Sequence, residues 1–293
     1  MFKEFIKKWR QYRYRFVPWI SLNLKERSVR EVKTGEHDKI IPDEQLVDSL
    51  LGILHALFDN EPSSRTTHHL NVSQHHEEAM SMDEMYELYK PRSFEDVRSL
   101  HMKNMEKLYD TTGFVIDRCP SQLIGGGRGV AVTRGKIPKH SLVALYPGTL
   151  YQPQDPILFQ SINNPFIFRC IDGLLIDGND SGLSKFIFKS CHGRERIGPF
   201  YTCDMSWLTD FPINPLGIGQ YINNRSNDHP ANVAYQEVDL GDSLQFHLRQ
   251  YIPHAWYQSP GYSDYRCRTV ALVSLRDISE DEELFSSYFT VVH

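Results

Sequence analysis

Three short segments of this chain combine glycines, amides and acidic side chains with two tyrosines, a set of residues able to hold a small polar ligand. They are Gly125–Val130, Gln220–Asn224 and Asp277–Tyr288. Glycine permits positive φ and close approach of the backbone to a ligand, and the amides of Asn223 and Asn224 can pair with a zwitterionic amino acid end. Taken singly, each segment also suits a plain role as a turn, an Asx motif or a core tyrosine. The choice between these roles depends on whether the three act together.

The glycine-rich segment does not fit a dinucleotide-binding loop. That fingerprint places Gly-x-Gly-x-x-Gly between a strand and a helix, whereas Val130 occupies the last glycine position and the residues after it read as a strand. The glycines therefore predict either a flexible turn or a loop that meets its ligand through main-chain atoms.

The order and spacing of the three segments, with Tyr146-Pro147-Gly148 after the first, resemble those of the SET-domain lysine methyltransferases. The resemblance implies that the glycine-x-glycine at Gly127 and Gly129 contacts S-adenosylmethionine through main-chain atoms, and that Asn223 holds the methionine moiety. Tyr288 is the implied catalytic tyrosine at the methyl-transfer pore, and Tyr146 is implied to line the lysine channel. The full implied cofactor-binding set is Gly127, Arg128, Gly129, Asn223, Asn224 and Tyr288.

The chain departs from the family pattern in two of the segments. Asn224, Arg225 and Ser226 replace the three residues that follow the leading asparagine of the family signature, and the downstream Pro-Asn is stretched to Pro230-Ala231-Asn232. Asp281 stands where the family has a glycine, which is a mild change because Asp tolerates the left-handed backbone region better than most residues. The first departure leaves open a SET-fold binding module without turnover.

The chemistry that the resemblance implies is the transfer of methyl groups to a neutral lysine amine. An apolar channel favours the neutral amine and aligns it with the methyl group, so neither a metal ligand nor a covalent nucleophile is expected. In the family an aromatic residue two positions before the catalytic tyrosine often limits the space around the amine. Here that position is Ser286, which leaves room for a second or third methyl group unless another side chain, such as Tyr146, fills it.

The elements that must position these residues divide the chain at about residue 113. Residues 129–133, 140–146 and 269–275 predict strands in a β-rich region with few long helical patterns. We therefore expect an α+β fold, with a helical N-terminal region over 1–112 and a SET domain over 113–293. The resemblance implies small sheets with a threaded C-terminal segment for the latter, and a substrate-selecting insert near residues 180–219.

The first 112 residues predict helices joined by polar linkers. A basic amphipathic helix opens the chain and ends at Pro18, a second follows Asp43 as its N-cap, and a third covers Glu77–Lys90. A fourth begins with the capping box at Ser93 and ends at Gly113. The first helix could pack on the body, touch an anionic membrane or serve as a targeting signal.

Composition narrows the class of protein. No apolar run is long enough for a transmembrane helix, and five cysteines without a Cys-x-x-Cys pair favour reduced thiols in an intracellular protein, nuclear or cytosolic, with mitochondrial targeting left open. Residues 1–35 are basic, so the body is more acidic than the net charge of −5. An acidic body favours a basic protein or peptide partner over direct nucleic-acid binding. The histidines at 68, 69, 75 and 76 lie among Thr, Asn, Ser and Gln without a cysteine, which favours a solvated linker over a metal site.

We therefore expect an S-adenosylmethionine-dependent protein-lysine methyltransferase. Two alternatives remain open, a SET-fold binding module that has lost turnover and an adaptor that acts through its helical N-terminal region. Cofactor binding separates the enzyme from the adaptor, and methyl transfer separates it from the inactive module.

Overall fold

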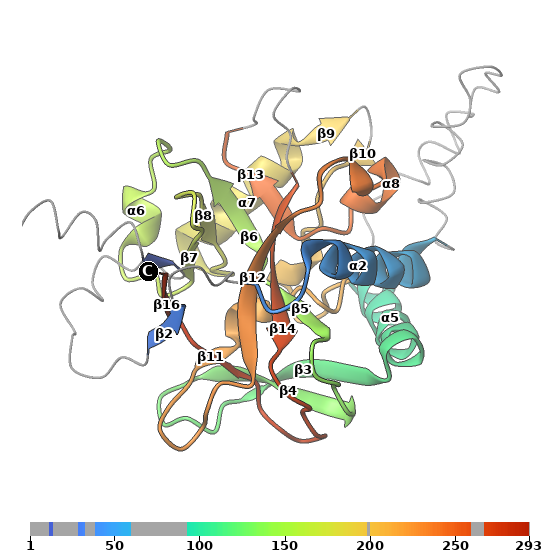
Figure 1. Cartoon of the computed structure of the whole chain (residues 1–293). Helices are drawn as coiled ribbons and strands as arrows, with labels where there is room; N and C mark the ends of the chain where they lie inside the picture. Colours follow the sequence, from blue (N-terminus) through green and yellow to red (C-terminus); the bar gives the residue numbers. More distant parts are fainter. Residues whose placement is uncertain are drawn as a thin grey trace, which may run out of the picture.

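A computed structural model of the chain describes residues 12–13, 29–32, 39–59, 93–197, 200–258 and 267–292. In these residues the fold is mixed α+β, with several small sheets of two to four strands (Figure 1), which confirms the expected fold class at this level. The first and third predicted helices and the histidine cluster at 68–76 lie outside the described residues. No helix within the described ranges is long and apolar enough to cross a membrane.

Two larger sheets form the centre of the molecule, and all three strands predicted from the sequence are present. The strand order is β12-β14-β5 in one sheet and β13-β6-β8-β7 in the other, and shorter pairings are β3-β4, β11-β15, β10-β9 and β1-β16-β2. The strands are β1 (Tyr12–Arg13), β2 (Val29–Val32), β3 (Phe114–Pro120), β4 (Arg128–Gly135), β5 (Leu142–Leu145), β6 (Gly148–Tyr151), β7 (Ile167–Arg169), β8 (Leu175–Asp177), β9 (Arg196–Ile197), β10 (Phe200–Tyr201), β11 (Asn223–Asn224), β12 (Val233–Asp239), β13 (His254–Trp256), β14 (Arg268–Ser274), β15 (Phe285–Ser286) and β16 (Phe289–Val292).

Two long helices, α2 and α5, lie together beside the β12-β14-β5 sheet (Figure 1). The helices are α2 (Asp43–Phe58), α5 (Phe94–Thr112), α6 (Leu158–Ser161), α7 (Gly182–Arg194) and α8 (Phe246–Arg249), with short 3-10 turns η2 (Ser206–Leu208), η3 (Gly219–Tyr221) and η4 (Gly241–Ser243). The insert predicted near residues 180–219 contains α7, β9, β10 and η2.

The ends of α2 and α5 show how well local sequence sets a helix boundary. The capping box of α5 is present, because Asp96 N donates to Ser93 Oγ and Ser93 N donates to the Asp96 carboxylate, and the helix ends at Gly113 with φ of 79°. The predicted N-cap of α2 is wrong. Pro42 is the N-cap, and Asp43 is instead the first helical residue, whose carboxylate accepts from the Gln236 side chain on β12.

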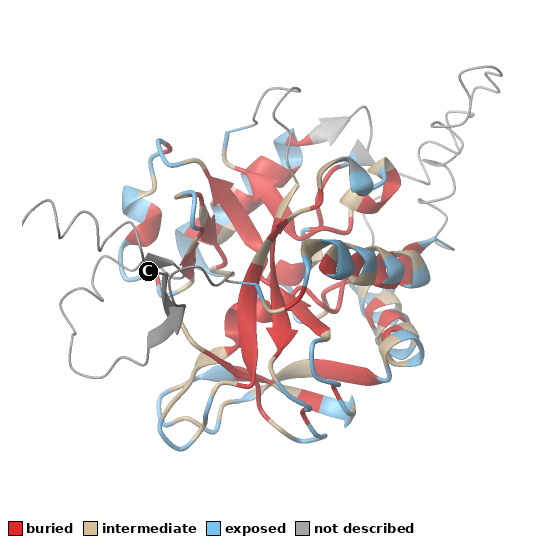
Figure 2. Ribbon diagram, viewed as in Figure 1, coloured by how far each residue is buried: buried red, intermediate tan, exposed pale blue. Residues whose placement is uncertain are grey.

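The β12-β14-β5 sheet separates two hydrophobic clusters. Ala271 and Val273 of β14 face the cluster that contains the buried stripe of α2, whereas Val270 and Leu272 face the cluster around the candidate site. Alternation of side chains along a strand produces this division. Figure 2 shows the buried residues concentrated in the central strands and on the inner faces of both helices. The helices thus share a core with the sheet, while the boundary placed near residue 113 stays a prediction.

Candidate active site

The glycine-rich segment forms the turn between β3 and β4. Gly125 and Gly127 have φ of 75° and 63°, and Ser121 N donates to Gly127 O over 2.9 Å to close the turn. A side chain on Gly127 would meet no atom within 4 Å. The backbone at Gly127 is therefore exposed in a conformation that favours glycine, and a ligand can approach it closely.

Gly129 is required for a different reason. A Cβ atom there would lie 2.2 Å from Oε1 of Glu283, which is buried. The Glu283 carboxylate is itself fixed, because it accepts from Ser121 Oγ and Gln122 N, each over 2.7 Å. Gly129 therefore lets the acidic C-terminal segment pack against β4.

That C-terminal segment runs antiparallel beside β4 and then pairs in parallel with β11. Asp281 N donates to Val132 O over 2.9 Å, and Leu284 N donates to Val130 O over 2.7 Å. The next two residues, Phe285 and Ser286, pair in parallel with Asn223 and Asn224. Asp281 has φ of 65°, so the left-handed conformation expected at this position is confirmed.

Two neighbouring amides join the three segments. Asn223 Nδ2 donates to Arg128 O over 3.0 Å, and Asn224 Oδ1 accepts from Tyr288 N over 2.9 Å. The Tyr288 hydroxyl donates to Ile222 O over 3.1 Å. The structure thus brings Arg128, Asn223, Asn224 and Tyr288 together, although they come from three distant parts of the sequence.

Asn232 supports this junction and was not among the predicted site residues. It is 1% exposed, its Nδ2 donates to Glu283 O over 2.9 Å, and its Oδ1 accepts from Phe285 N over 2.8 Å. These bonds fix the chain just before β15. The stretched Pro230-Ala231-Asn232 was a signal in the sequence, but nothing there indicated which backbone groups the amide would meet.

Tyr146 lies deeper than the other predicted residues. It is fully buried, its hydroxyl donates to Phe166 O over 2.7 Å, and its ring packs near Phe168 and Tyr235. Tyr288 packs against the same hydrophobic cluster. The lining role of Tyr146 in a lysine channel stays a prediction.

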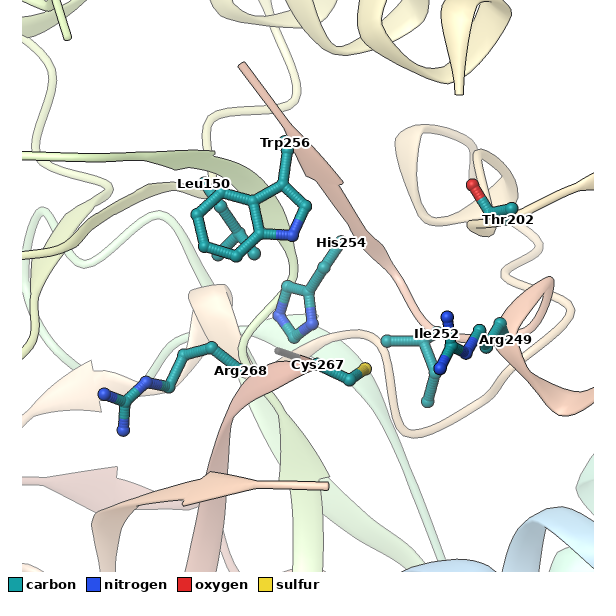
Figure 3. A pocket seen from close by; sticks show the side chains of 8 residues that line it. All are labelled: Leu150, Thr202, Arg249, Ile252, His254, Trp256, Cys267 and Arg268. Atoms are coloured by element: carbon teal, nitrogen blue, oxygen red, sulfur yellow. The ribbon is translucent and has the colours of Figure 1, made fainter. Parts of the chain in front are cut away.

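His254 fixes the backbone of Tyr146 through a hydrogen bond. Its Nε2 donates to Tyr146 O over 2.7 Å, and burial lowers the pKa of His254 to about 4, so the ring is neutral near pH 7. The ring borders a cavity of about 10 Å³ lined also by Trp256, Cys267 and Arg268 (Figure 3), which has room for about one water molecule. This cavity is too small for a lysine side chain.

Tyr235 lies beside Ser286. The two hydroxyl groups are hydrogen-bonded over 3.1 Å, and both residues are buried. Tyr235 therefore contacts the position where the sequence predicted spare room.

A charged cluster flanks the junction at Arg128. The Arg128 guanidinium lies 5.7 Å from the centre of the Tyr221 ring and 3.7 Å from the Asp210 carboxylate. Burial and a hydrogen bond to Asp180 raise the pKa of Tyr221 to about 12, so its hydroxyl keeps its proton. The Tyr221 hydroxyl and the nearby carboxylates raise the pKa of Arg128 further, which keeps this side chain cationic.

An acidic hollow of about 390 Å³ borders the junction on its other side. Gln122, Asn232 and Glu283 line it, together with the loop that contains Asp281. Gly127, Asn223 and Tyr288 are not among its lining residues. The predicted cofactor-binding residues therefore face a different part of the surface.

Comparison with known proteins gives relatives over nearly the whole chain. "SET domain-containing protein 9" of Homo sapiens is 45% identical over 97% of this chain and 96% of its own length, and its counterpart in Pongo abelii is 43% identical over 90% and 97%. A scan against protein-family models gives no match.

Solved structures are more distant. KRYPTONITE in complex with mCHH DNA, an H3(1-15) peptide and SAH is 19% identical with a TM-score of 0.32, over 62% of this chain and 25% of that chain. Because the two relatives match nearly the whole chain at 45% and 43% identity, the chain belongs to the SET domain-containing protein 9 family.

Proposed function

We propose that this chain is an S-adenosylmethionine-dependent protein-lysine methyltransferase. Membership of a SET-domain family supports the reaction class. The observation that carries the proposal is the junction itself, in which Asn223 binds the backbone of Arg128 and Asn224 binds the backbone of Tyr288. Three segments that are far apart in the sequence thereby form one site.

The residues at the junction fit a cofactor with a zwitterionic end. The open backbone at Gly127 admits a ligand, the side-chain carbonyl of Asn223 can accept from an ammonium group, and Arg128 is a cation beside them. Gly129 contributes by letting Glu283 pack behind the loop. S-adenosylmethionine, when bound by Gly127, Arg128, Gly129, Asn223, Asn224 and Tyr288, supplies an activated methyl group.

The aromatic residues near the junction prepare the substrate amine. A free lysine has a pKa of about 10.4, and burial among the rings of Tyr146, Tyr235 and Tyr288 disfavours its charged form. The Tyr288 hydroxyl is oriented by its bond to Ile222 O, and its backbone is fixed by Asn224. These contacts hold the tyrosine in one place while an amine approaches.

The departure at Asn224 favours the enzyme over an inactive module. Its side chain makes a direct contact with the backbone of the proposed catalytic tyrosine, and Arg225 N donates to Ser286 O over 2.8 Å, which extends the pairing of β11 with β15. Asn224, one of the residues that replace the family signature, thus positions the backbone of Tyr288. We propose a protein or peptide lysine as the substrate, with a basic sequence favoured by the acidic body, and an intracellular location, which the five free cysteines support.

The test is methyl transfer by the purified chain to proteins of a cell extract, with radiolabelled S-adenosylmethionine. Tyr288→Phe keeps the ring and removes the hydroxyl, so transfer should fall more than about tenfold while cofactor binding is kept. Tyr251→Phe, in the hydrophobic cluster that α2 shares with the β12-β14-β5 sheet, is the matched control and should keep activity.

Three results would contradict the proposal. Full activity of Tyr288→Phe overturns the role of this residue. Cofactor binding by calorimetry without any transfer identifies an inactive module. Absence of binding favours the adaptor.

A further inference from the structure

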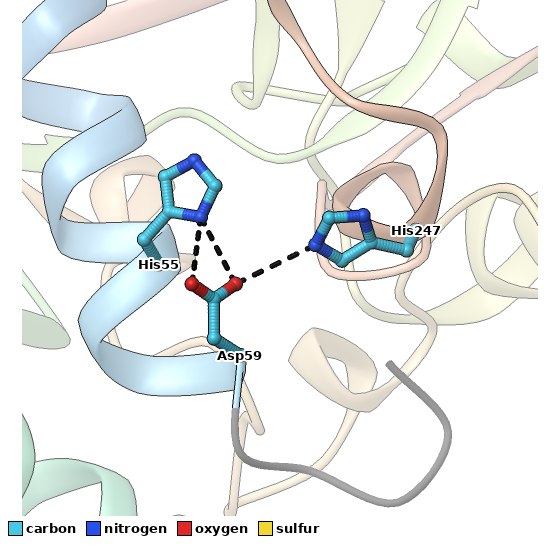
Figure 4. A group of neighbouring side chains, drawn as sticks. All are labelled: His55, Asp59 and His247. Carbon is cyan, nitrogen blue, oxygen red and sulfur yellow. Dashed lines mark hydrogen bonds and ion pairs between the residues drawn. The ribbon is translucent and has the colours of Figure 1, made fainter. Parts of the chain in front are cut away.

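Three potential metal ligands meet where the end of α2 faces α8. His55 lies in the last turn of α2, Asp59 follows its end, and His247 belongs to α8 (Figure 4). Their ligand atoms all lie within 4.8 Å of one another. We propose that His55, Asp59 and His247 bind a divalent transition-metal ion of the zinc class, which clamps α2 to α8.

The distances suit such an ion. His55 Nδ1 lies 2.9 and 3.0 Å from the two carboxylate oxygens of Asp59, and His247 Nε2 lies 3.5 Å from Oδ1 of the same group. Tetrahedral zinc with bonds of about 2.0 to 2.1 Å spaces its ligand atoms by about 3.3 Å. The distances to Asp59 therefore bracket this spacing, and the two imidazole nitrogens, which lie within 4.8 Å of each other, would close on the ion as it binds.

The donor types and exposure agree with this assignment. Imidazole nitrogens are good ligands for zinc, copper, nickel and iron, and a single carboxylate is a common third ligand. The side chains of His55 and Asp59 are 32% and 45% exposed, whereas that of His247 is 1% exposed. An ion can thus enter from solvent and keep a water molecule as its fourth ligand.

Asp59 lies at the C-terminal end of α2, which carries partial negative charge. The Lys107 ammonium already donates to Leu57 O at this helix end, and a divalent ion at Asp59 would add to that positive charge. No sequence pattern indicated the site, because Asp59 and His247 lie 188 positions apart.

The test uses the full chain without a polyhistidine tag, in a background in which His68, His69, His75 and His76 are changed to Gln. This background removes competing imidazoles. Titration with Co²⁺, a spectroscopic substitute for zinc, should give one bound ion per chain with the visible absorption of a tetrahedral site. Zn²⁺ should displace it.

Two variants decide the assignment. Asp59→Asn and His55→Gln, both at partly exposed positions, should weaken binding by at least about 100-fold, because loss of outer-shell partners alone costs up to that factor. Asp48→Asn, an exposed position of the same helix with the same loss of charge, should bind like the parent. Equal affinity of Asp59→Asn and Asp48→Asn, or no bound ion in the parent, would overturn the proposal.

A thermal measurement shows whether the ion acts as a clamp. Zn²⁺ at a hundredfold excess over its Kd should raise the Tm of the Asp48→Asn protein by about 5 °C. The Tm of Asp59→Asn should not change. A metal-induced rise of equal size in both proteins would contradict the clamp.

Discussion

The site junction and the seam between α2 and the β12-β14-β5 sheet are held together in different ways. At the junction, single polar atoms of Asn223, Asn224 and Asn232 each join segments distant in sequence. At the seam, buried apolar side chains hold the segments together, because the leucines of α2 pack against β5 and β14. Gln236 is the main polar contact of the seam, where its amide binds the backbone of Ile41 before α2.

The difference separates stability from geometry. A hydrogen bond within the protein replaces one to water, so its net contribution to stability is modest. Its preferred length and direction, however, fix the bonded atoms to within fractions of an ångström. Buried apolar area contributes most of the stability but tolerates small shifts. We therefore expect substitutions at the seam to change unfolding, and substitutions at the junction to change ligand binding and turnover.

The largest expected effect is on stability, at Leu54. This α2 residue is fully buried, so Leu54→Ala should lower the free energy of unfolding by about 2 to 5 kcal/mol, measured by urea denaturation. Gly52→Ala on the exposed face of the same helix, with no atom within 4 Å of the new methyl group, should instead raise it by about 0.5 to 1 kcal/mol. If the folded Leu54→Ala protein also lost cofactor affinity, the two regions would not be separable.

The second effect concerns pH and His254, whose ring donates to Tyr146 O. Because burial lowers the pKa of His254 from 6.5 to about 4, the unfolded chain binds the proton more readily between these values. The stability contributed by the neutral ring is complete above about pH 6.5 and is lost as pH falls toward 4, by up to about 3 kcal/mol.

The His254→Gln variant isolates this contribution from that of other groups, such as His101 and Asp177, whose pKa values burial also shifts. Its amide can still donate to Tyr146 O but does not titrate. The difference in free energy of unfolding between the two proteins should therefore shrink or reverse from pH 7 to pH 4. A constant difference over that range would refute the role of the buried ring.

The third effect is on ligand binding at Asn223. Asn223→Ala removes the bond to Arg128 O and the amide proposed to hold the cofactor, so affinity for S-adenosylmethionine should fall by about 1 to 3 kcal/mol in calorimetry. Asn227→Ala, at an exposed loop position nearby, is the control and should bind normally. Unchanged affinity in folded Asn223→Ala protein would remove Asn223 from the site.

Local signals in the sequence predicted helices, strands and turns well, but they predicted contacts between distant residues poorly. The capping box at Ser93 and the left-handed conformation at Asp281 depend on a few neighbouring residues, and the structure agrees with both. The N-cap predicted for α2 was wrong. The helix already includes Asp43, whose carboxylate accepts from Gln236, a residue far along the chain.

The same limit applies to the candidate site. The segments were identified by type and order, and the structure brings Asn223, Asn224 and Tyr288 together. The packing of Gly129 on Glu283 and the amide bonds of Asn232 depend on pairing between β4, β11 and the C-terminal segment. No local pattern encodes that pairing, so these roles required the fold.

The smallest expected effect concerns the number of methyl groups transferred. The sequence predicted spare room at Ser286, but the Tyr235 hydroxyl lies 3.1 Å from Ser286 Oγ and occupies part of that space. Ser286→Phe would have to displace the Tyr235 ring, and such overpacking costs about 1 to 3 kcal/mol, so this variant tests stability as much as product. Tyr235→Phe is the cleaner change, because it deletes only the hydroxyl.

If the proposed reaction holds, Tyr235→Phe should shift products toward dimethyl and trimethyl lysine, since the freed volume lies beside the proposed position of the amine. Mass spectra of a methylated substrate measure this distribution, and Tyr251→Phe at the seam should leave it unchanged. The shift should be modest, because the volume freed by one hydroxyl group is smaller than the space that an added methyl group needs. An unaltered distribution in Tyr235→Phe, or an equal shift in Tyr251→Phe, would show that the space beside Ser286 does not control the product.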